Sequence, residues 1–255
     1  MKTNISKTIG LFVVVLLLGA CGGETNNPYK DISPAQGARV KFYHAAPDAP
    51  AIDIYVNDQR LSGINTIPPA TAGSLAYFNS YPLQDYASIA PGTAKTKVVA
   101  PVSATNPTET TVLTADIPVE DGKYYSVFAY GAGAKPEAIL WADNLMATDK
   151  SKAYIRFLNL ITGTPVGGYD LAINGVVVYK NIDYKAGSAN FIALEPIAFG
   201  ATAIAIQLRA AGTATVVSAT TLQPYAGRFY TFIGRGLVSE KTGAKIPTLS
   251  VSVNL

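Results

Sequence analysis

Residues 38–58 read ARVKFYHAAPDAPAIDIYVND, and this stretch decides the fold class. Val40, Phe42 and His44 alternate with neighbours of a different character, and the same alternation of apolar with other residues continues over residues 52–58. Successive side chains of a β-strand point to opposite faces of a sheet, so a period of two predicts two half-buried strands. The prolines between the two runs predict a tight turn.

The same blocks occur a second time further along the chain. Matching blocks in the same order predict two tandem domains, over residues 38–145 and 153–255, joined by a short polar linker at 146–152. The blocks are ARVKFYH at 38–44 with AYIRFLN at 153–159, IDIYVND at 52–58 with YDLAING at 169–175, and GKYYSVFAYG at 122–131 with GRFYTFIGRG at 227–236.

Each copy contains about seven short strands separated by turn residues, which is typical of a β-sandwich. Asn174-Gly175 predicts a two-residue type I′ hairpin, and Ala211-Gly212 predicts a second hairpin. We find no helical period after the first 20 residues. The sequence therefore predicts an all-β chain of two tandem antiparallel β-sandwiches, Ig-like in the broad sense, with a β-barrel as the alternative.

The first 20 residues have the layout of a secretory signal peptide, with two lysines followed by an apolar run. This run is too short to span a bilayer as a helix. Leu18-Gly19-Ala20-Cys21 resembles the lipobox of bacterial lipoproteins, which implies cleavage before Cys21 and its lipidation with acyl chains such as palmitate. We expect residues 21–37 to be a lipidated flexible tether, and Gly22 favours the outer membrane.

Composition excludes several classes of protein. The chain has 255 residues, of which 49% are hydrophobic and 15% charged, and this excludes an intrinsically disordered protein. One Cys and one His exclude a disulfide framework and a Cys/His zinc site. The formal net charge of +3 includes two signal-peptide lysines, so it is no argument for a nucleic-acid partner.

The opening of the first copy carries a family resemblance. VKFYHAAPDAPAIDIYVND, residues 40–58, resembles the start of the bacterial family called domain of unknown function 4397. The second copy is divergent, because NLITGTPVGG replaces HAAPDAPA, although Asp170, Asn174 and Gly175 remain. The resemblance implies an extracytoplasmic β-sandwich module, and it implies neither an activity nor catalytic residues.

His44 and Asp48 are the first candidates for a site, as an acid–base pair or as part of a ligand pocket. The favoured interpretation is structural: His44 faces the core at a strand end, where it hydrogen-bonds the backbone, and Asp48 closes a turn. Asp53 and Asp170 could contribute to a calcium site, but we expect each to hold a turn or to pair with a cross-strand cation.

Three tyrosines form the second candidate site. Tyr77, Tyr81 and Tyr86 lie in AYFNSYPLQDY, residues 76–86, where exposed aromatic rings could stack on sugars or meet a protein partner. The alternative is that these tyrosines fill the core of the sandwich.

No catalytic motif is present. Gly131-Ala132-Gly133 and Gly234-Arg235-Gly236 do not complete a nucleotide-binding loop, and both are interpreted as turns after a strand. We therefore expect a non-catalytic cell-envelope lipoprotein that acts as a binding, adhesion or structural module, without cofactor or metal. Its partners would be the membrane, through Cys21, and an envelope protein or a glycan. A glycan-binding module at the cell surface is the first alternative, and a hydrolase is the second.

Overall fold

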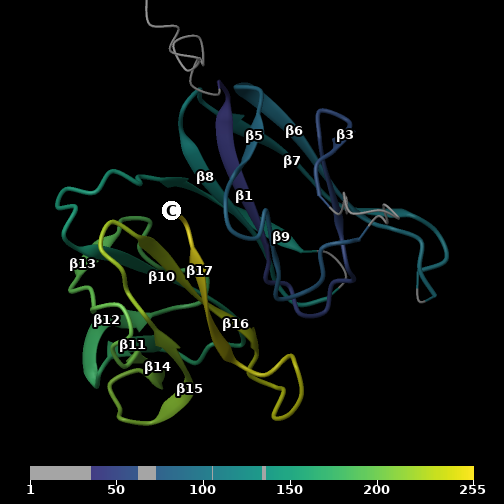
Figure 1. Cartoon of the computed structure of the whole chain (residues 1–255). Helices are drawn as coiled ribbons and strands as arrows, with labels where there is room; N and C mark the ends of the chain where they lie inside the picture. Colours follow the sequence, from purple (N-terminus) through teal and green to yellow (C-terminus); the bar gives the residue numbers. More distant parts are fainter. Residues whose placement is uncertain (1–35, 63–72, 105, 134–135) are drawn as a thin grey trace, which may run out of the picture. The chain divides into compact units, whose positions relative to one another are not determined.

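The computed structural model describes residues 36–62, 73–104, 106–133 and 136–255 (Figure 1). The expected signal peptide, Cys21 and most of the tether lie outside these residues. The described part is all β, as predicted, and contains no helix. The first half carries β1 (Ala38–His44), β2 (Asp53–Val56), β3 (Gln59–Arg60), β4 (Ser80–Tyr81), β5 (Ala87–Ile89), β6 (Gly92–Ala100), β7 (Thr110–Val119), β8 (Tyr124–Tyr130) and β9 (Glu137–Asp143). The second half carries β10 (Ala153–Thr162), β11 (Tyr169–Ile173), β12 (Val176–Ile182), β13 (Ile192–Leu194), β14 (Ile204–Ala210), β15 (Val216–Leu222), β16 (Phe229–Leu237) and β17 (Thr248–Val253).

The two halves share one topology. In the first, β4-β1-β8-β9 form one sheet, with β5 also on β1, and β3-β2-β6-β7 form another. In the second, β13-β10-β16-β17 correspond to the former sheet and β12-β11-β14-β15 to the latter. We call the sheets that contain β1 and β10 the inner sheets, and the other two the outer sheets. The strand order therefore repeats as the sequence blocks do.

Each sandwich has its own apolar core between its inner and outer sheet. In the first half the core includes Val40, Ile54 and Val127, and in the second it includes Ile155, Leu171 and Phe232. These residues lie at alternate positions of their strands, so the period of two identified the core-facing side chains correctly. A compact unit spans residues 36–255 and contains both sandwiches.

One pair of strands in each half runs parallel. β1 pairs with β8, and β10 pairs with β16, in parallel register, whereas the other described strand pairs are antiparallel. A parallel pair needs a long crossover connection, and here the whole outer sheet lies in the chain between the two strands. Periodicity alone does not distinguish the two registers, because both place alternate side chains on the same face.

The predicted hairpins are confirmed. Asn174 and Gly175 have φ values of 47° and 85° and join β11 to β12, which fits a type I′ turn. Asn57 and Asp58, with φ values of 50° and 62°, join β2 to β3 at the equivalent place. Gly212, with φ of 69°, lies in the turn between β14 and β15.

The inner strands are buried on both faces. Every residue of β16 is buried, as are nine of the ten residues of β10. An exposed sheet would bury only alternate residues. A third apolar cluster covers the second face, and it joins Tyr43, Phe128 and Tyr130 of the first half to Leu158 and Ile233 of the second.

Candidate functional site

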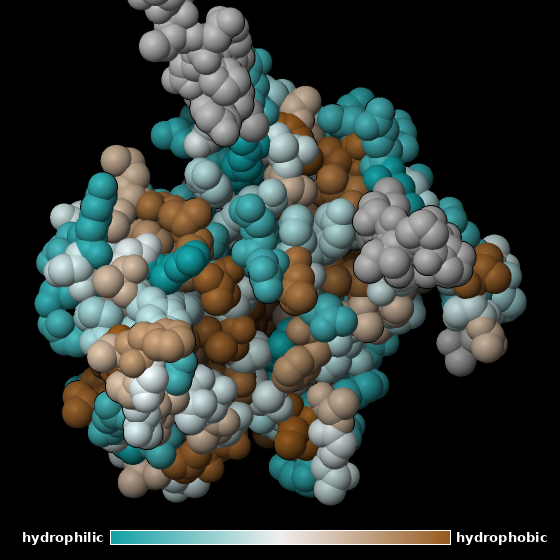
Figure 2. Space-filling model, in the orientation of Figure 1, coloured by the Kyte–Doolittle hydropathy of each residue, from teal (hydrophilic) through white to brown (hydrophobic). Residues whose placement is uncertain are grey.

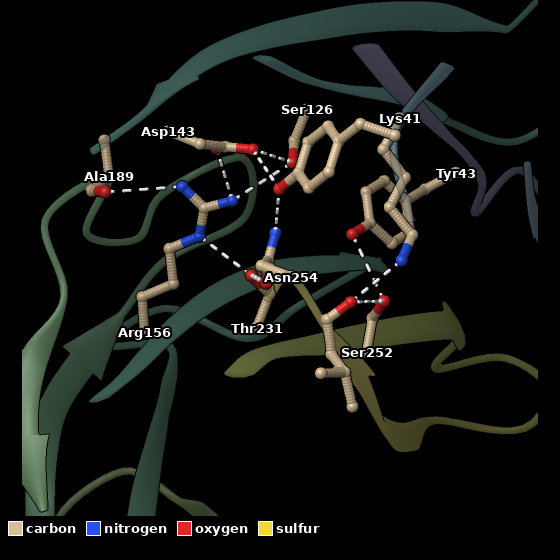
Figure 3. A network of polar contacts seen from close by, with 11 residues as sticks. Lys41, Tyr43, Ser126, Asp143, Arg156, Ala189, Thr231, Ser252 and Asn254 are labelled. Carbon is tan, nitrogen blue, oxygen red and sulfur yellow. Dashed lines mark hydrogen bonds and ion pairs between the residues drawn. The ribbon is translucent and has the colours of Figure 1, made fainter. Parts of the chain in front are cut away.

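The inner sheets enclose a buried ion pair. Nη2 of Arg156, on β10, lies 2.7 Å from Oδ1 of Asp143, at the end of β9, and neither side chain is exposed (Figure 3). The same Arg156 nitrogen donates to Ser126 Oγ at 3.2 Å, and Nε donates to Thr231 Oγ1 at 2.9 Å. The guanidinium carbon is 5.0 Å from the Trp141 ring centroid. A cation of the second half is thus neutralised by a carboxylate of the first.

Polar groups extend this ion pair toward the C-terminus. Tyr86 donates its hydroxyl proton to Asp143 Oδ2 at 2.6 Å and accepts from Asn254 Nδ2 at 2.6 Å. Asn254 Oδ1 accepts from Thr231 Oγ1, also at 2.6 Å. Burial and the neighbouring Asp143 carboxylate hold the pKa of Tyr86 far above its usual value, so the phenol stays protonated and donates.

Lys41 and Tyr43 form a second set of hydrogen bonds between the two halves. Lys41 Nζ donates to the carbonyl of Val253 at 2.8 Å, and the Tyr43 hydroxyl lies 3.2 Å from Ser252 Oγ (Figure 3). Burial lowers the pKa of Lys41 to about 8. Burial raises the pKa of Tyr43 to about 12.

We assign a structural role to this inter-sandwich network. Its donors and acceptors contact one another, so few of them are left for a ligand. A buried ion pair costs several kcal/mol when one partner is removed, because the other charge then remains in a medium of low dielectric constant. Tyr86, one of the candidate ligand-binding tyrosines, is part of this network and is only 7% exposed.

A different cluster contains buried polar atoms without partners. Among the described residues, His44 Nδ1, Tyr77 OH and Arg235 Nε are buried and form no hydrogen bond. The ring centroids of His44 and Tyr77 are 6.1 Å apart, and the Arg235 guanidinium carbon is 6.0 Å from the Tyr77 centroid. Because native proteins pair nearly all buried polar groups, such a cluster indicates a place where a bound molecule completes the pairing.

Arg235 is the most unusual member of the cluster. It lies on β16 with 5% of its surface exposed, and its side chain forms no ion pair or hydrogen bond with any residue in the described ranges. Its guanidinium carbon lies 3.3 Å from the Phe78 ring centroid, a cation–π contact between the two halves. Burial lowers the pKa of Arg235 to about 10, so at neutral pH the residue is a buried cation.

The sequence around Arg235 explains how the strand places it there. Gly234 to Gly236 lie inside β16, so the prediction of a turn after a strand is wrong at this position. Gly236 has φ of 121°, and a Cβ there would lie 2.3 Å from the carbonyl oxygen of Ile246. Only glycine fits this close approach of the 245–246 backbone. The prediction failed because Gly-X-Gly can also lie inside a strand, where the glycines allow another segment of the same chain to pack closely. Gly131 to Gly133, in contrast, do follow β8 as predicted.

The hydrogen bond of His44 selects one tautomer of its neutral ring. Its Nε2 lies 2.9 Å from the carbonyl oxygen of Pro50, so Nε2 carries the proton and Nδ1 is left as an acceptor. Burial lowers the pKa of His44, and nearby Arg235 lowers it further. Asn159 occupies the equivalent place in the second half and donates to the carbonyl oxygen of Ile182 at 3.0 Å. Both side chains therefore hydrogen-bond backbone at a strand end, which is the structural role expected for His44.

Phe78 adopts a backbone conformation that bulky residues rarely have. Its φ is 86°, and its N–H donates to the carbonyl oxygen of His44 at 2.9 Å. The ring is 38% exposed and packs against both Arg235 and Tyr77. Strained backbone of this kind concentrates at binding and catalytic sites, because the rest of the fold must hold it in place.

A pocket of about 230 Å³ opens beside this aromatic–cation pair. We call it the Arg235 pocket. Arg235 is its only charged lining residue, and Tyr43 and Ser252 of the inter-sandwich network also reach it. Phe78 supplies an aromatic ring to the wall. The other lining residues are neutral polar or aliphatic, namely Asn79, Ser80, Leu83, Gln84, Ile233, Ser250, Val251 and Val253.

Asp48 contributes to a neighbouring contact between the halves. Its Oδ1 accepts from Lys245 Nζ at 2.8 Å, and its Oδ2 accepts from the Gly133 N–H at 3.2 Å. The bond from Lys245 is the main reason why the pKa of Asp48 is lowered. Asp48 is therefore engaged by Lys245 and does not pair with His44 as an acid–base dyad.

A larger pocket has different properties. It measures about 920 Å³ and lies against Tyr124, Trp141 and Met146. Asp143 is the buried charged residue on its wall, and Arg156 already neutralises it. We therefore place the candidate site at the smaller Arg235 pocket, where a buried charge is uncompensated.

Among the described residues, the exposed large apolar side chains form no broad patch on the face that Figure 2 shows. The most exposed large ones include Leu83, Met146, Val166 and Phe199, which come from separate loops. Figure 2 shows brown hydrophobic residues interspersed with teal hydrophilic residues across the visible face. A broad docking face would instead gather them in one patch.

The structure brings together only some of the predicted site residues. Tyr77 and His44 lie at the unpaired cluster, and Asp48 lies at the neighbouring Asp48–Lys245 contact. Tyr81, on β4, is half-buried against the first core, and Tyr86 is in the inter-sandwich network. Sequence reasoning missed Arg235, because it interpreted Gly234-Arg235-Gly236 as a turn and because a missing acidic partner cannot be seen along the sequence.

Asp53 and Asp170 behave as expected of structural aspartates. Asp53 pairs with Arg60 at 2.7 Å, and Asp170 accepts from the backbone N–H groups of Asn181 and Gly212. Within the described ranges, no group of three or more His, Cys, Asp or Glu side chains is arranged to hold a metal ion. No described helix has the length and hydropathy that crossing a bilayer requires.

Comparison with known proteins identifies a family. No curated protein matches the chain. A family profile described as Domain of unknown function (DUF4397) matches residues 38–166, which is about half of the sequence and runs from β1 through β10. The matched range thus includes His44, Asp48 and Tyr77, whereas Arg235 lies beyond it. On this match, the chain belongs to the family of domain of unknown function 4397.

Proposed function

We propose that this protein is a non-catalytic, lipid-anchored module of the cell envelope that binds a ligand in the Arg235 pocket. The observation that carries the proposal is the buried, unpaired Arg235, which packs against the strained Phe78 at the pocket wall. A protein that buries a charge without a counter-ion loses stability. A binding role accounts for that loss, because a ligand would supply the partner.

Binding is favoured over catalysis by the chemistry around His44. Its Nε2 is tied to the Pro50 carbonyl, and its neighbours Tyr77 and Arg235 are proton donors with raised or high pKa values. A general base needs a nucleophile or substrate proton within hydrogen-bond reach. The nearest aspartate in sequence, Asp48, is paired with Lys245 instead.

The anchor and the second family copy belong to the same proposal. The Leu18-Gly19-Ala20-Cys21 segment supports lipidation at Cys21 and retention at the outer membrane. The identical strand order of the two sandwiches supports a second, divergent copy of the family domain over residues 153–255. In this view the first copy supplies Phe78 at the pocket wall, and the second supplies the cation.

The anchor is tested by Cys21→Ala. We expect the wild type to incorporate radiolabelled palmitate and to sediment with membranes, and the variant to do neither. Incorporation of label by the variant, or its equal retention in the membrane fraction, would refute lipid anchoring at Cys21.

Ligand binding is tested with the purified Cys21→Ala protein on an array of neutral and acidic glycans and envelope peptides. We expect the protein to bind a ligand on the array, and we expect Phe78→Ala to weaken that binding. Phe199→Ala, at an exposed aromatic residue outside the pocket, is the control and should bind as the parent protein does. A blank array from folded protein would refute the binding function for these ligand classes. Binding of a glycan would support the glycan-binding form of the proposal, for which the exposed Phe78 ring is the supporting observation.

A further inference from the structure

We propose that the Arg235 pocket binds the carboxylate of an acidic sugar residue, with the Arg235 guanidinium as the group that recognises the charge. This inference rests on the proposed binding function and specifies its ligand class. The juxtaposition that suggests it is a buried cation, an exposed aromatic ring and a wall of neutral polar side chains at one small pocket.

The first step is the sign of the charge. Arg235 is the only charged residue lining the pocket, and no acidic side chain in the described ranges pairs with it. The comparable buried arginine, Arg156, has Asp143 at 2.7 Å. The chain thus neutralises one of its buried guanidinium groups and leaves the other for a partner. An anion is the partner that compensates a buried cation.

The second step is the shape of the anion. A guanidinium presents its N–H groups as a planar fork that matches a carboxylate in a bidentate arrangement. The Arg235 guanidinium carbon lies 3.3 Å from the Phe78 ring centroid, and its buried Nε has no hydrogen-bond partner, so the aromatic contact leaves N–H groups for a ligand. Arg235 is held between Gly234 and Gly236 on a fully buried strand, so its position is fixed before the ligand arrives.

The third step concerns the rest of the ligand. The pocket volume of about 230 Å³ lies below the range of about 300–1,000 Å³ that whole drug-sized ligands occupy, so the pocket admits one residue of a chain. Its polar wall carries neutral hydroxyl and amide groups, which both donate and accept, as sugar hydroxyls do. Asn79, Ser80 and Gln84 are such residues. Ser250 and Ser252 also line the wall, and their hydroxyls donate to backbone carbonyls of the protein itself. Phe78 supplies an exposed aromatic face for sugar C–H groups.

The test compares two ligands with the same sugar backbone, one with charged carboxylates and one with neutral methyl esters. Isothermal titration of the Cys21→Ala protein with oligogalacturonate is set against its methyl ester, in which the carboxylates are neutral. We expect heat of binding from the acid and at least tenfold weaker binding of the ester. Equal affinity for the ester, or no binding of oligogalacturonate at millimolar concentration, would overturn the inference. A tetrapeptide that binds through its C-terminal carboxylate while the sugar acid does not would also overturn it.

Three variants test the role of Arg235 itself. Arg235→Met removes the charge, and we expect about a tenfold or greater loss of affinity for oligogalacturonate. Arg235→Lys keeps the charge but loses the fork, so we expect an intermediate loss. Arg228→Met, at an exposed arginine just before β16, is the control and should bind as the wild type does. Unchanged affinity in Arg235→Met would overturn the inference.

Stability separates this binding role from a structural one. Removing an uncompensated buried charge should leave the urea midpoint of Arg235→Met equal to or above that of the wild type. A lowered midpoint would indicate that Arg235 serves the fold, and would overturn the inference. If these tests fail but the protein still binds a neutral glycan on the array, the acidic-sugar inference is wrong and the proposed binding function remains supported.

Discussion

Removing the charge of Asp143 tests whether the inter-sandwich network holds the two halves together. Asp143→Asn keeps the shape of the side chain but leaves the fully buried Arg156 without its counter-ion. It also perturbs the acceptor of two short hydrogen bonds, from Tyr86 at 2.6 Å and Ser126 at 2.7 Å. Breaking a buried ion pair from one side costs about 3–5 kcal/mol. That is a large share of the roughly 5–15 kcal/mol by which domains are stable.

Equilibrium urea unfolding provides the assay, and the chain contains its own probe. Trp141 is the only tryptophan, and its ring lies 5.0 Å from the Arg156 guanidinium carbon. Its fluorescence therefore reports on the contact between the inner sheets, while circular dichroism reports on strand content in both halves. We expect the fluorescence transition of Asp143→Asn to move to lower urea, ahead of the loss of strand structure.

A double-mutant cycle measures the pairing itself. Arg156→Met should also destabilise, because it leaves the Asp143 carboxylate buried without its cation. In the double variant neither charge remains alone. Its loss in free energy of unfolding should therefore be smaller, by at least about 2 kcal/mol, than the sum of the losses in the two single variants. Glu137→Gln, which breaks the exposed pair with Lys185, is the control and should leave the transition unchanged. Single-variant losses below about 1 kcal/mol that simply add would refute our account of the network.

Three further predictions concern other buried positions of the protein. Burial lowers the pKa of Lys41 to about 8, whereas an unfolded lysine keeps its ordinary pKa of 10.5. Between these pH values the unfolded chain binds more protons than the folded one, so the free energy of unfolding should rise with pH there. Lys41→Met should flatten that rise, and an unchanged slope would contradict the assignment. Gly236→Ala places a Cβ against backbone and should destabilise by more than about 1 kcal/mol, whereas Gly243→Ala, with open space around it, should cost less. Tyr86→Phe removes two buried hydrogen bonds and should cost about 1–3 kcal/mol in urea unfolding, against no measurable change for Tyr81→Phe.

The fold was largely predictable because its signals are local. Alternation in residues 38–44 and 52–58, and the Asn174-Gly175 turn, are properties of neighbouring residues, and each corresponds to a strand or hairpin in the structure. The parallel pairing of β1 with β8 was not predictable in this way. It depends on which strands meet after the chain has crossed the outer sheet.

The candidate site was only partly predictable because its parts are distant in the sequence. His44, Tyr77 and Asp48 attracted attention by residue type and neighbourhood. Arg235 did not, because its significance is the lack of an acidic partner, which depends on every residue packed around it. Tyr86 was chosen as a candidate surface aromatic, yet its hydroxyl is buried, where it donates to Asp143 and accepts from Asn254, directly after β17.

The sequence by itself determined the strand class, the duplicated order of blocks and the side of each strand that faces its own core. A side-chain period needs only a few consecutive residues, and both copies carry it. Only the tertiary structure decided that the opposite face of β1, with Lys41 and Tyr43, is also buried, and that Arg156 finds a carboxylate while Arg235 does not. The physical reason is that burial and charge pairing are set by what another part of the chain places against a surface, and alternation along one strand carries no information about that neighbour.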